Sequence, residues 1–284
     1  MSKCVFCGGE IKKELVTIPY TTATNIFFSQ VLNNHTIIGV TGSKGKSTTA
    51  SLIYEILKTA GKRVELLGNI GKPMLESLLS HTQHPAPKIY VLELSSYQLD
   101  DIKFSPHIAV VTNLFEEHMD FHGNVKNYFQ AKENIINYQN KSNYFVYNPK
   151  NKIMTKWLED YTGTAVPFNH KKFKSHLLGE HNQYNIGAAV AAVNILGISQ
   201  KTIRKALLHF KGLPHRLEFV GEFKGITFYD DAISTTPDST IMALKALKRF
   251  SPVRNSEGSP HTSSLRGRQR KVSHGVDTIF LGGE

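Results

Sequence analysis

A glycine-rich segment that ends in Lys46 and Ser47 is the stretch whose residue types most directly suggest chemistry. This segment, TGSKGKSTT (residues 41–49), follows a short apolar run and precedes a helix-forming stretch. A strand, a glycine-rich turn and a helix N-terminus together direct backbone N–H groups at one anion, and a lysine adds a full positive charge. The strict pattern G-x-x-x-x-G-K-[ST] would need a glycine where the chain has Val40, so Gly42 takes over the early turn. The residues predict a phosphate-binding loop, with an ordinary surface turn as the alternative.

Two further polar groups follow apolar runs that read as buried strands. Glu93 closes the run Ile89–Leu94, and His118 follows the run Ile108–Leu114. A carboxylate at a strand end can hold a divalent cation against phosphate oxygens, with the Ser47 hydroxyl as another oxygen ligand. A carboxylate that caps a helix is the alternative for Glu93, and a solvated loop histidine is the alternative for His118. Because parallel strands end at one edge of a sheet, we expect both groups near the phosphate loop.

Lys132 occupies an unusual position in the predicted helix Val125–Tyr138. The apolar residues of this stretch recur at i, i+3, i+4, i+10 and i+11, and Lys132 takes the missing i+7 position. A buried ammonium is costly unless it is paired or its charge is altered. Carbamylation by CO2 would turn this amine into an anionic oxygen ligand for a metal. The alternative, which periodicity alone favours, is a lysine whose ammonium reaches the edge of the stripe.

These residues must be positioned by elements that alternate between strand and helix. Such alternation predicts an α/β fold with a mostly parallel sheet flanked by helices, of the phosphate-loop type. The predicted strands are Arg63–Leu67, Ile89–Leu94, Ile108–Leu114 and Tyr144–Tyr147, besides the one before the loop; the helices run from Lys46 to Gly61, over Val125–Tyr138 and over Asn182–Leu196. Ile18–Leu32 is weakly patterned and suggests a strand-to-helix fragment. Later, Leu217–Val220 and Ile226–Tyr229 predict a hairpin, Asp238–Leu247 a helix and Val276–Gly283 a strand.

Composition bounds the class of protein. The chain has 284 residues, of which 40% are hydrophobic and 20% charged, and no apolar run approaches a membrane span. With no signal-peptide pattern, a cytoplasmic location is expected. Of the net charge of +11, the segment 249–275 supplies six Lys or Arg against one Glu, so we expect anionic small-molecule substrates and no nucleic-acid partner. The pair Cys4 and Cys7 is too few for a closed zinc site, and an unpaired tail is the simpler interpretation.

The ordered motifs of the chain resemble those of the Mur ligases, the enzymes that build the peptidoglycan stem peptide. The matching segments are VTGSKGKSTT, GNIGKP, LELSSYQL, TNLFEEHMD, QAKENI, GEHNQYNIGAA and GLPHRLE. The resemblance covers about Ile37 to Leu247 and the final VDTIFLGGE. LELSSYQL and GLPHRLE are typical of the members that add glutamate to UDP-N-acetylmuramoyl-L-alanine.

The resemblance implies ATP-dependent amide formation through an acyl phosphate, with Mg²⁺ as the cofactor and a monomer as the working form. It implies that Lys46, His118 and Lys132 are catalytic, and that a pair of metal ions is held by Ser47, Glu93, His118 and a carbamylated Lys132. It assigns ATP binding to Gly42, Ser43, Lys44, Gly45, Lys46, Ser47, Thr48, Asn182, Asn185, Arg216 and Asp231. It places Asn69, Ser95 and Gln98 near the muramoyl-alanine.

The chain departs from the family pattern in three places. Residues 1–35 are expected to be a remnant of the family's N-terminal uridine-diphosphate domain, before a central ATP-binding domain at 36–212. Residues 213–284 are expected to start a Rossmann-like C-terminal domain that is incomplete and is interrupted by a disordered basic segment at 249–275. Ile233 stands where the family has a lysine, so only Asp231 of this stretch is carried over. The stretch also resembles that of a related ligase type acting on L-glutamate, which leaves the glutamate enantiomer open. A catalytically silent ATP-binding remnant and a folylpolyglutamate-synthase-like ligase remain the alternatives.

Overall fold

The computed structural model describes residues 21–79, 89–116, 119–170, 172–224, 226–234 and 237–248. The predicted strand at 276–283, the basic segment at 249–275, both cysteines and His118 lie outside these residues. The described chain divides into two compact units, one reaching to His176 and resuming at Asn182–Phe210, the other comprising Leu177–His181 and the residues from Lys211 onward. None of the described helices is long and apolar enough to cross a membrane.

A six-stranded parallel sheet forms the centre of the first unit. Its strand order is β2-β3-β1-β4-β5-β6, and every neighbouring pair is parallel. The strands are β1 (Thr36–Thr41), β2 (Val64–Gly68), β3 (Ile89–Glu93), β4 (Ile108–Val111), β5 (Tyr144–Tyr147) and β6 (Thr164–Pro167). Crossovers leave β1 toward β2 on one side and β4 toward β5 on the other, so the connections diverge between β1 and β4. Ligands of open α/β sheets bind at such a point, outside the carboxyl ends of the strands.

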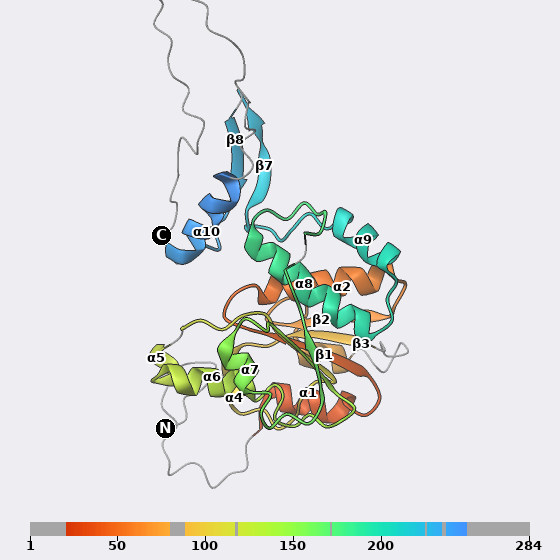
Figure 1. Cartoon of the computed structure of the whole chain (residues 1–284). Coiled ribbons are helices and arrows are strands. Elements are labelled where there is room, and N and C mark those ends of the chain that lie inside the picture. Colours follow the sequence, from red (N-terminus) through yellow and green to blue (C-terminus); the bar gives the residue numbers. More distant parts are fainter. Residues whose placement is uncertain are drawn as a thin grey trace, which may run out of the picture. The chain divides into compact units, whose positions relative to one another are not determined.

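Helices cover both faces of this sheet. Figure 1 shows α2, α8 and α9 on one face and α1, α4, α6 and α7 on the other. The helices of this unit are α1 (Ala23–Val31), α2 (Lys46–Thr59), α3 (Met74–Leu79), α4 (Ser96–Asp100), α5 (Met119–His122), α6 (Val125–Glu133), α7 (Lys152–Lys156), α8 (Glu180–Ile195, its first residues belonging to the second unit) and α9 (Gln200–His209). The architecture confirms the predicted α/β class.

Helix α1 belongs to the core of this unit, although the sequence suggested only a short segment before the sheet. Phe27 and Phe28 are fully buried, and the Phe27 ring lies edge-on to Tyr90 of β3 at 5.1 Å between centroids. The Thr22 side chain accepts a hydrogen bond from the Asn25 amide and caps the helix. Two large buried aromatic residues hold this helix on the sheet, because each removes a large apolar area from water.

Two predicted boundaries were wrong. The strand expected over Ile108–Leu114 ends at Val111, and the helix expected to reach Tyr138 ends at Glu133. In both cases apolar residues beyond the end stay buried: Leu114 is 4% exposed and Ile135 is 0% exposed. Burial continues through a turn, so hydrophobicity alone cannot mark the end of the element.

The second unit contains an antiparallel hairpin and one helix. The strands β7 (Glu218–Phe223) and β8 (Ile226–Asp230) pair with an irregularity between Phe219 and Gly221, and α10 spans Pro237–Lys248. The predicted hairpin and helix are confirmed.

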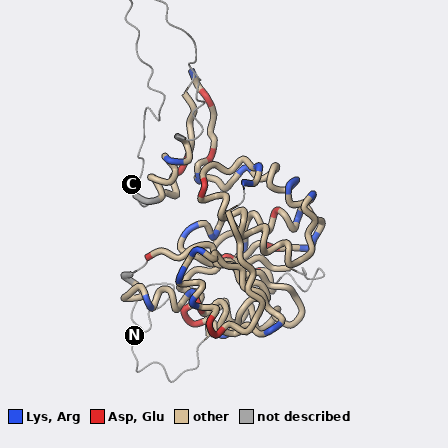
Figure 2. The backbone as a smooth tube through the Cα atoms, in the orientation of Figure 1, with Lys and Arg blue, Asp and Glu red and all other residues tan. Residues whose placement is uncertain are grey.

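Lys and Arg of the described residues are spread over several elements, among which α9 carries Lys201, Arg204 and Lys205 (Figure 2).

Candidate phosphate-binding site

The loop between β1 and α2 has the conformation that its glycines predict. Gly42 has φ +144° and Gly45, the N-cap of α2, has φ +81°. A Cβ on Gly42 would lie 2.1 Å from the Thr112 Oγ1, and one on Gly45 would lie 2.2 Å from the Asn185 Oδ1. Both positions therefore need glycine for space as well as for backbone conformation. Gly42 does make the early turn that the strict pattern assigns to an earlier glycine.

The first half of this loop is held against the end of β4. The Ser43 amide donates to the Asn113 carbonyl at 2.9 Å. The Lys44 amide donates to the Asn113 Oδ1 at 2.8 Å, and the Lys44 carbonyl accepts from the Thr112 Oγ1 at 2.7 Å. The amides of Ser43 and Lys44 are thus used inside the protein. The amides suited to an anion are those of Gly45 and of the first turn of α2, where a helix has no carbonyl to pair with its N–H groups.

Lys46 and Ser47 begin α2, as the sequence predicted, and both are partly exposed. The Lys46 Nζ curls back and donates to the carbonyls of Gly42 (3.0 Å) and Ser43 (2.9 Å). Its ammonium therefore lies within the loop. A bound phosphate group would offer this ammonium oxygens of full negative charge in place of two carbonyls. Thr48, the last residue assigned to the loop, is buried.

Glu93 ends β3 beside the phosphate loop. It pairs in register with Val40 of β1 and Gly68 of β2, and its side chain is only 4% exposed. Among the described residues its buried Oε2 has no hydrogen-bond partner. The helix-cap alternative for Glu93 is wrong, because Ser95 caps α4. An unsatisfied carboxylate oxygen buried at a strand end fits the coordination of a hard divalent cation, which takes oxygen ligands.

Lys132 is buried and points at the same loop. Its side chain is 1% exposed, and its Nζ donates to the Gly42 carbonyl at 2.9 Å and approaches the Thr41 Oγ1 at 3.5 Å. The Nζ also lies 4.8 Å from the centre of the Tyr128 ring. The interpretation that this lysine reaches the edge of its helix is therefore wrong. The Gly42 carbonyl accepts from two lysines at once, Lys46 and Lys132.

Sequence reasoning missed the role of Tyr128, which was assigned to an apolar stripe. The Tyr128 hydroxyl donates to the Ser43 Oγ at 3.0 Å, and the side chain is fully buried. The Ser43 Oγ in turn donates to the Phe115 carbonyl and accepts from the Phe115 amide, each at 2.9 Å. Tyr128 and Ser43 thus tie α6, the phosphate loop and the segment after β4 together.

Two of the residues assigned to the muramoyl-alanine, Ser95 and Gln98, form a capping box at the start of α4. The Ser95 Oγ accepts from the Gln98 amide, and the Gln98 Oε1 accepts from the Ser95 amide at 2.9 Å. Asn69 follows β2, is exposed, and donates its backbone amide to the Glu93 carbonyl at 3.2 Å. The three residues lie at the carboxyl ends of β2 and β3.

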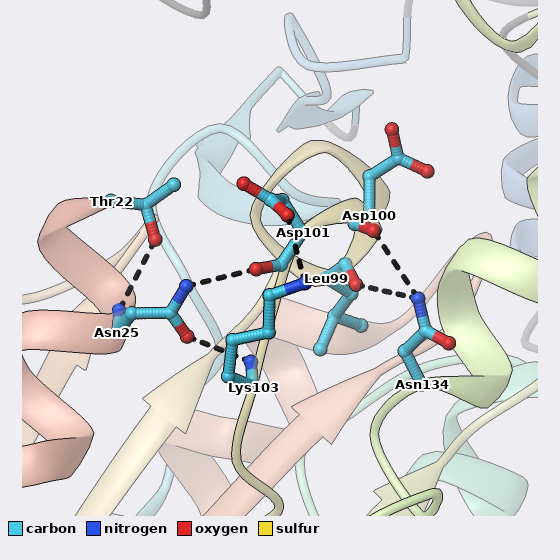
Figure 3. Close-up of polar contacts among 7 residues, drawn as sticks. All are labelled: Thr22, Asn25, Leu99, Asp100, Asp101, Lys103 and Asn134. Atoms are coloured by element: carbon cyan, nitrogen blue, oxygen red, sulfur yellow. Dashed lines mark hydrogen bonds and ion pairs between the residues drawn. The ribbon is translucent and has the colours of Figure 1, made fainter. Parts of the chain in front are cut away.

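The opposite end of α4 is anchored by two asparagines, which Figure 3 shows as sticks. The Asn25 Nδ2 donates to the Asp101 carbonyl and its Oδ1 accepts from the Lys103 amide, both at 2.8 Å. The Asn134 Nδ2 donates to the Leu99 carbonyl at 3.0 Å. These bonds, from α1 and from the C-cap of α6, fix the short helix that carries Gln98.

The residues assigned to the adenosine fall in both units. Asn185 of α8 is buried, donates to the Asn182 Oδ1 at 3.0 Å and lies against Gly45. In the second unit, the Asp231 Oδ1 accepts from the Leu217 amide at 3.0 Å and its Oδ2 accepts from the Ser234 Oγ at 2.5 Å. Arg216 is partly exposed and lies between two non-glycine residues of positive φ, His215 and Leu217.

The strand order and the loop after the central strand β1 define a P-loop-type α/β domain. Residues 40–168 match the family model described as Mur ligase middle domain. This central part of the chain is therefore a Mur ligase middle domain.

Curated relatives and solved structures agree with this assignment. The chain is 40% identical over 264 residues to the UDP-N-acetylmuramoylalanine–D-glutamate ligase of Oenococcus oeni, covering 84% of this chain and 59% of that protein. It is 36% identical over 245 residues to the ligase of the same name from Streptococcus mutans, covering 78% and 53%. The chain thus spans little more than half the length of these relatives.

Among solved structures, the MurF ligase of Thermotoga maritima in complex with ADP superposes with a TM-score of 0.65 at 22% identity, covering 80% of this chain and 60% of that one. MurF from Acinetobacter baumannii gives 0.64 at 21% identity, covering 79% and 56%. At this level of identity the likeness concerns the fold.

Proposed function

We propose that this chain carries the ATP site of a ligase that joins glutamate to UDP-N-acetylmuramoyl-L-alanine. The observation that carries the proposal is the meeting of a phosphate loop with a buried, unsatisfied carboxylate oxygen of Glu93 at one edge of the sheet. Phosphoryl transfer depends on the positioning of the phosphate groups and on the neutralisation of developing charge. The phosphate loop would position the phosphate groups, and the Glu93 carboxylate would hold a cation that neutralises the charge. The similarity to curated ligases of that name supports the choice of reaction.

The reaction has two chemical steps. The γ-phosphoryl group of ATP passes to the substrate carboxylate, which forms an acyl phosphate and releases ADP. The amine of glutamate then attacks the acyl carbon, the C–O bond to phosphate breaks, and the amine loses a proton as the amide forms. Lys46 binds the phosphate oxygens during transfer, and the amides of Gly45 and of the first turn of α2 hold the same oxygens.

Mg²⁺, when bound, would supply positive charge that offsets the charge of the phosphate groups. Within this proposal Ser47 and Glu93 hold the first ion, because both offer oxygen ligands at the phosphate loop. His118 and Lys132 serve the second ion. The Lys132 ammonium would first lose a proton, and the neutral amine would then bond to CO2 and lose a second proton. The resulting carbamate would supply two oxygens that share one negative charge. The burial of Lys132 beside the loop supports this role, since a buried ammonium is otherwise costly.

The remaining assignments complete the proposal. Asn182 and Asn185 of α8 contribute to the adenosine side of the ATP site. Arg216 and Asp231 of the second unit are ATP-binding residues in the same proposal. Asn69, Ser95 and Gln98 orient the muramoyl-alanine carboxylate, with Ser95 and Gln98 acting mainly through the position of α4. The names of the relatives favour D-glutamate as the amino acid. A cytoplasmic location and a monomeric working form are part of the same proposal.

The test is ATP-dependent release of phosphate with UDP-N-acetylmuramoyl-L-alanine and either D- or L-glutamate. We expect release with D-glutamate that stops when the muramoyl substrate is left out. Binding of ATP without release with either enantiomer would reject the ligase activity of this chain and favour a silent ATP-binding protein. Release with a folate substrate instead would favour the folylpolyglutamate-synthase-like alternative.

A further inference from the structure

The side chain of Asn113 pairs with both hydrogen-bonding groups of one loop residue. Its Oδ1 accepts from the Lys44 amide and its Nδ2 donates to the Lys44 carbonyl, each at 2.8 Å. The Asn113 side chain thus makes the same pair of hydrogen bonds to the Lys44 backbone that a neighbouring β-strand would make. An asparagine can do this because its side chain offers a carbonyl acceptor and an N–H donor side by side.

This pairing continues the ladder between β1 and β4 into the phosphate loop. Thr41 pairs with Val111 at the end of the strands, and the Thr112 amide donates to the Thr41 carbonyl at 3.0 Å. The Ser43 amide then donates to the Asn113 carbonyl at 2.9 Å. Beyond this point the backbones separate, and the Asn113 side chain bridges the gap to Lys44. The loop is therefore anchored as an extension of the sheet.

The anchor determines which loop amides can face an anion. The N–H of Lys44 points toward Asn113. The backbone then reverses direction at Gly45, whose φ is +81°, before α2 begins. That reversal directs the following amides to the open side of the loop, where a helix N-terminus favours negative charge. Rotation of the Lys44 peptide would instead present a carbonyl oxygen to the phosphate.

From these contacts we infer that Asn113 is a positioning residue for the phosphate loop, which it holds in the anion-binding conformation before a nucleotide arrives. The inference depends on the proposed function for the identity of the anion, a nucleoside triphosphate. Asn113 acts through Lys44, and the roles proposed for Lys46 in phosphate binding and for Glu93 in metal binding stay with those residues. These two bonds are exposed to solvent, and they matter for binding because a loop that must be ordered on binding lowers the affinity.

The experiment compares Asn113→Ala and Asn113→Asp with a control, Asn194→Ala. Asn194 also accepts a side-chain hydrogen bond, from Gln200, but it lies near the end of α8. Hydrogen exchange is measured on peptides that cover residues 41–48, without nucleotide. ATP and ADP affinities and the KM values for both substrates are measured on the same proteins.

For Asn113→Ala we expect faster exchange of the Lys44 amide, which loses its acceptor, and about ten- to hundredfold weaker nucleotide binding, from the loss of two hydrogen bonds. The KM for the muramoyl substrate should stay unchanged. Asn113→Asp keeps the acceptor for the Lys44 amide but turns a second oxygen toward the Lys44 carbonyl. It should protect that amide yet still weaken nucleotide binding. Asn194→Ala should change neither measurement.

Unchanged exchange of the Lys44 amide in Asn113→Ala would overturn the inference, as would nucleotide affinity equal to that of the wild type. A fall in unfolding midpoint with unchanged affinity would likewise reduce Asn113 to a structural residue. If the wild-type chain bound no nucleotide at all, the proposed function would fail, and the exchange measurement would still decide whether Asn113 holds the loop.

Discussion

Replacing Lys132 with methionine separates the chemistry of this lysine from its packing. Methionine has a similar length and no charge, so it fills the same buried space on α6. The Gly42 carbonyl that loses the Lys132 Nζ keeps the Lys46 Nζ as a donor at 3.0 Å. The variant therefore leaves no carbonyl of the loop unsatisfied. The second variant, Lys132→Ala, removes the charge and also leaves a cavity.

The expected magnitudes follow from the burial of the side chain. A hydrogen bond from a charged donor contributes about 1.5–3 kcal/mol, and the desolvation of a buried ammonium costs several kcal/mol, so the two effects largely cancel. We expect Lys132→Met to lie within about 1–2 kcal/mol of the wild type in free energy of unfolding, in either direction. Lys132→Ala adds the loss of a buried aliphatic stem, which costs about 2–4 kcal/mol more.

Stability is measured by urea unfolding with tryptophan fluorescence as the probe. Trp157 is the single tryptophan of the sequence and is buried in the core of the first unit, so it reports on that unit alone. Activity is measured as ATP-dependent phosphate release. We expect both variants to be inactive. Short carboxylic acids should partly restore Lys132→Ala, where the cavity can admit them, and should leave Lys132→Met inactive because its side chain fills the space.

Two results would refute this reasoning. Wild-type turnover in Lys132→Met would remove Lys132 from the metal site. A Lys132→Met variant that loses as much stability as Lys132→Ala would show that the ammonium, and not the aliphatic stem, stabilises the fold. The near-cancellation argued above would then be wrong.

Three further predictions concern the loop, the pH dependence and the packing. Lys46→Ala should abolish ATP binding in calorimetry while the urea midpoint of the Trp157 transition stays within the range of a surface substitution; retained binding would contradict the cradle. His107 accepts a hydrogen bond at its Nδ1 from a β1 amide, and burial lowers its pKa, so the folded state favours the neutral ring. The contribution of His107 to the free energy of unfolding is therefore present above the unfolded pKa of about 6.5. It is lost as the pH falls below that value, with a slope of at most about 1.4 kcal/mol per pH unit. His107→Asn keeps an acceptor without titrating, so urea unfolding between pH 7.5 and 5 should show a smaller loss than the wild type, and equal losses would contradict the assignment. Gly187→Ala would place a Cβ 2.6 Å from a backbone oxygen and should lose about 1–3 kcal/mol by urea unfolding followed at Trp157; an unchanged midpoint would contradict the packing argument.

The sheet and the loop were predictable from sequence because each leaves a local signal. Strands buried on both faces read as short apolar runs, and β3 is buried at every position. The two glycines of the loop are required by positive φ and by close neighbours, so their spacing indicates the turn even without the strict pattern. Glu93 was found by the same local logic, as a polar residue that closes an apolar run.

The sequence could suggest that Lys132 is buried, but it could not show which way the Lys132 side chain points. The helical stripe placed it among buried residues, yet the choice between solvent and interior depended on a carbonyl far away in the chain, that of Gly42. Asn113 and Tyr128 were missed for the same reason. Their bonds join residues 69 and 85 positions apart, and no local pattern records such a contact. Polar contacts across a sheet edge need the topology before they can be recognised.

In the phosphate loop, the carbonyl groups are paired with donors of the protein, while the amides at the start of α2 remain for an anion. The carbonyls of Gly42, Ser43 and Lys44 accept from the side chains of two lysines, Lys46 and Lys132, and from the threonine and asparagine that follow β4. Their partial negative charges are thereby directed into the protein, while the amides at the start of α2 stay on the open side. An anion then meets N–H groups without meeting carbonyl oxygens, which would repel it. Since protein donors alone hold the carbonyls, the loop needs no nucleotide to adopt this shape, and Lys46 exchanges its carbonyl partners for phosphate oxygens when a phosphate binds.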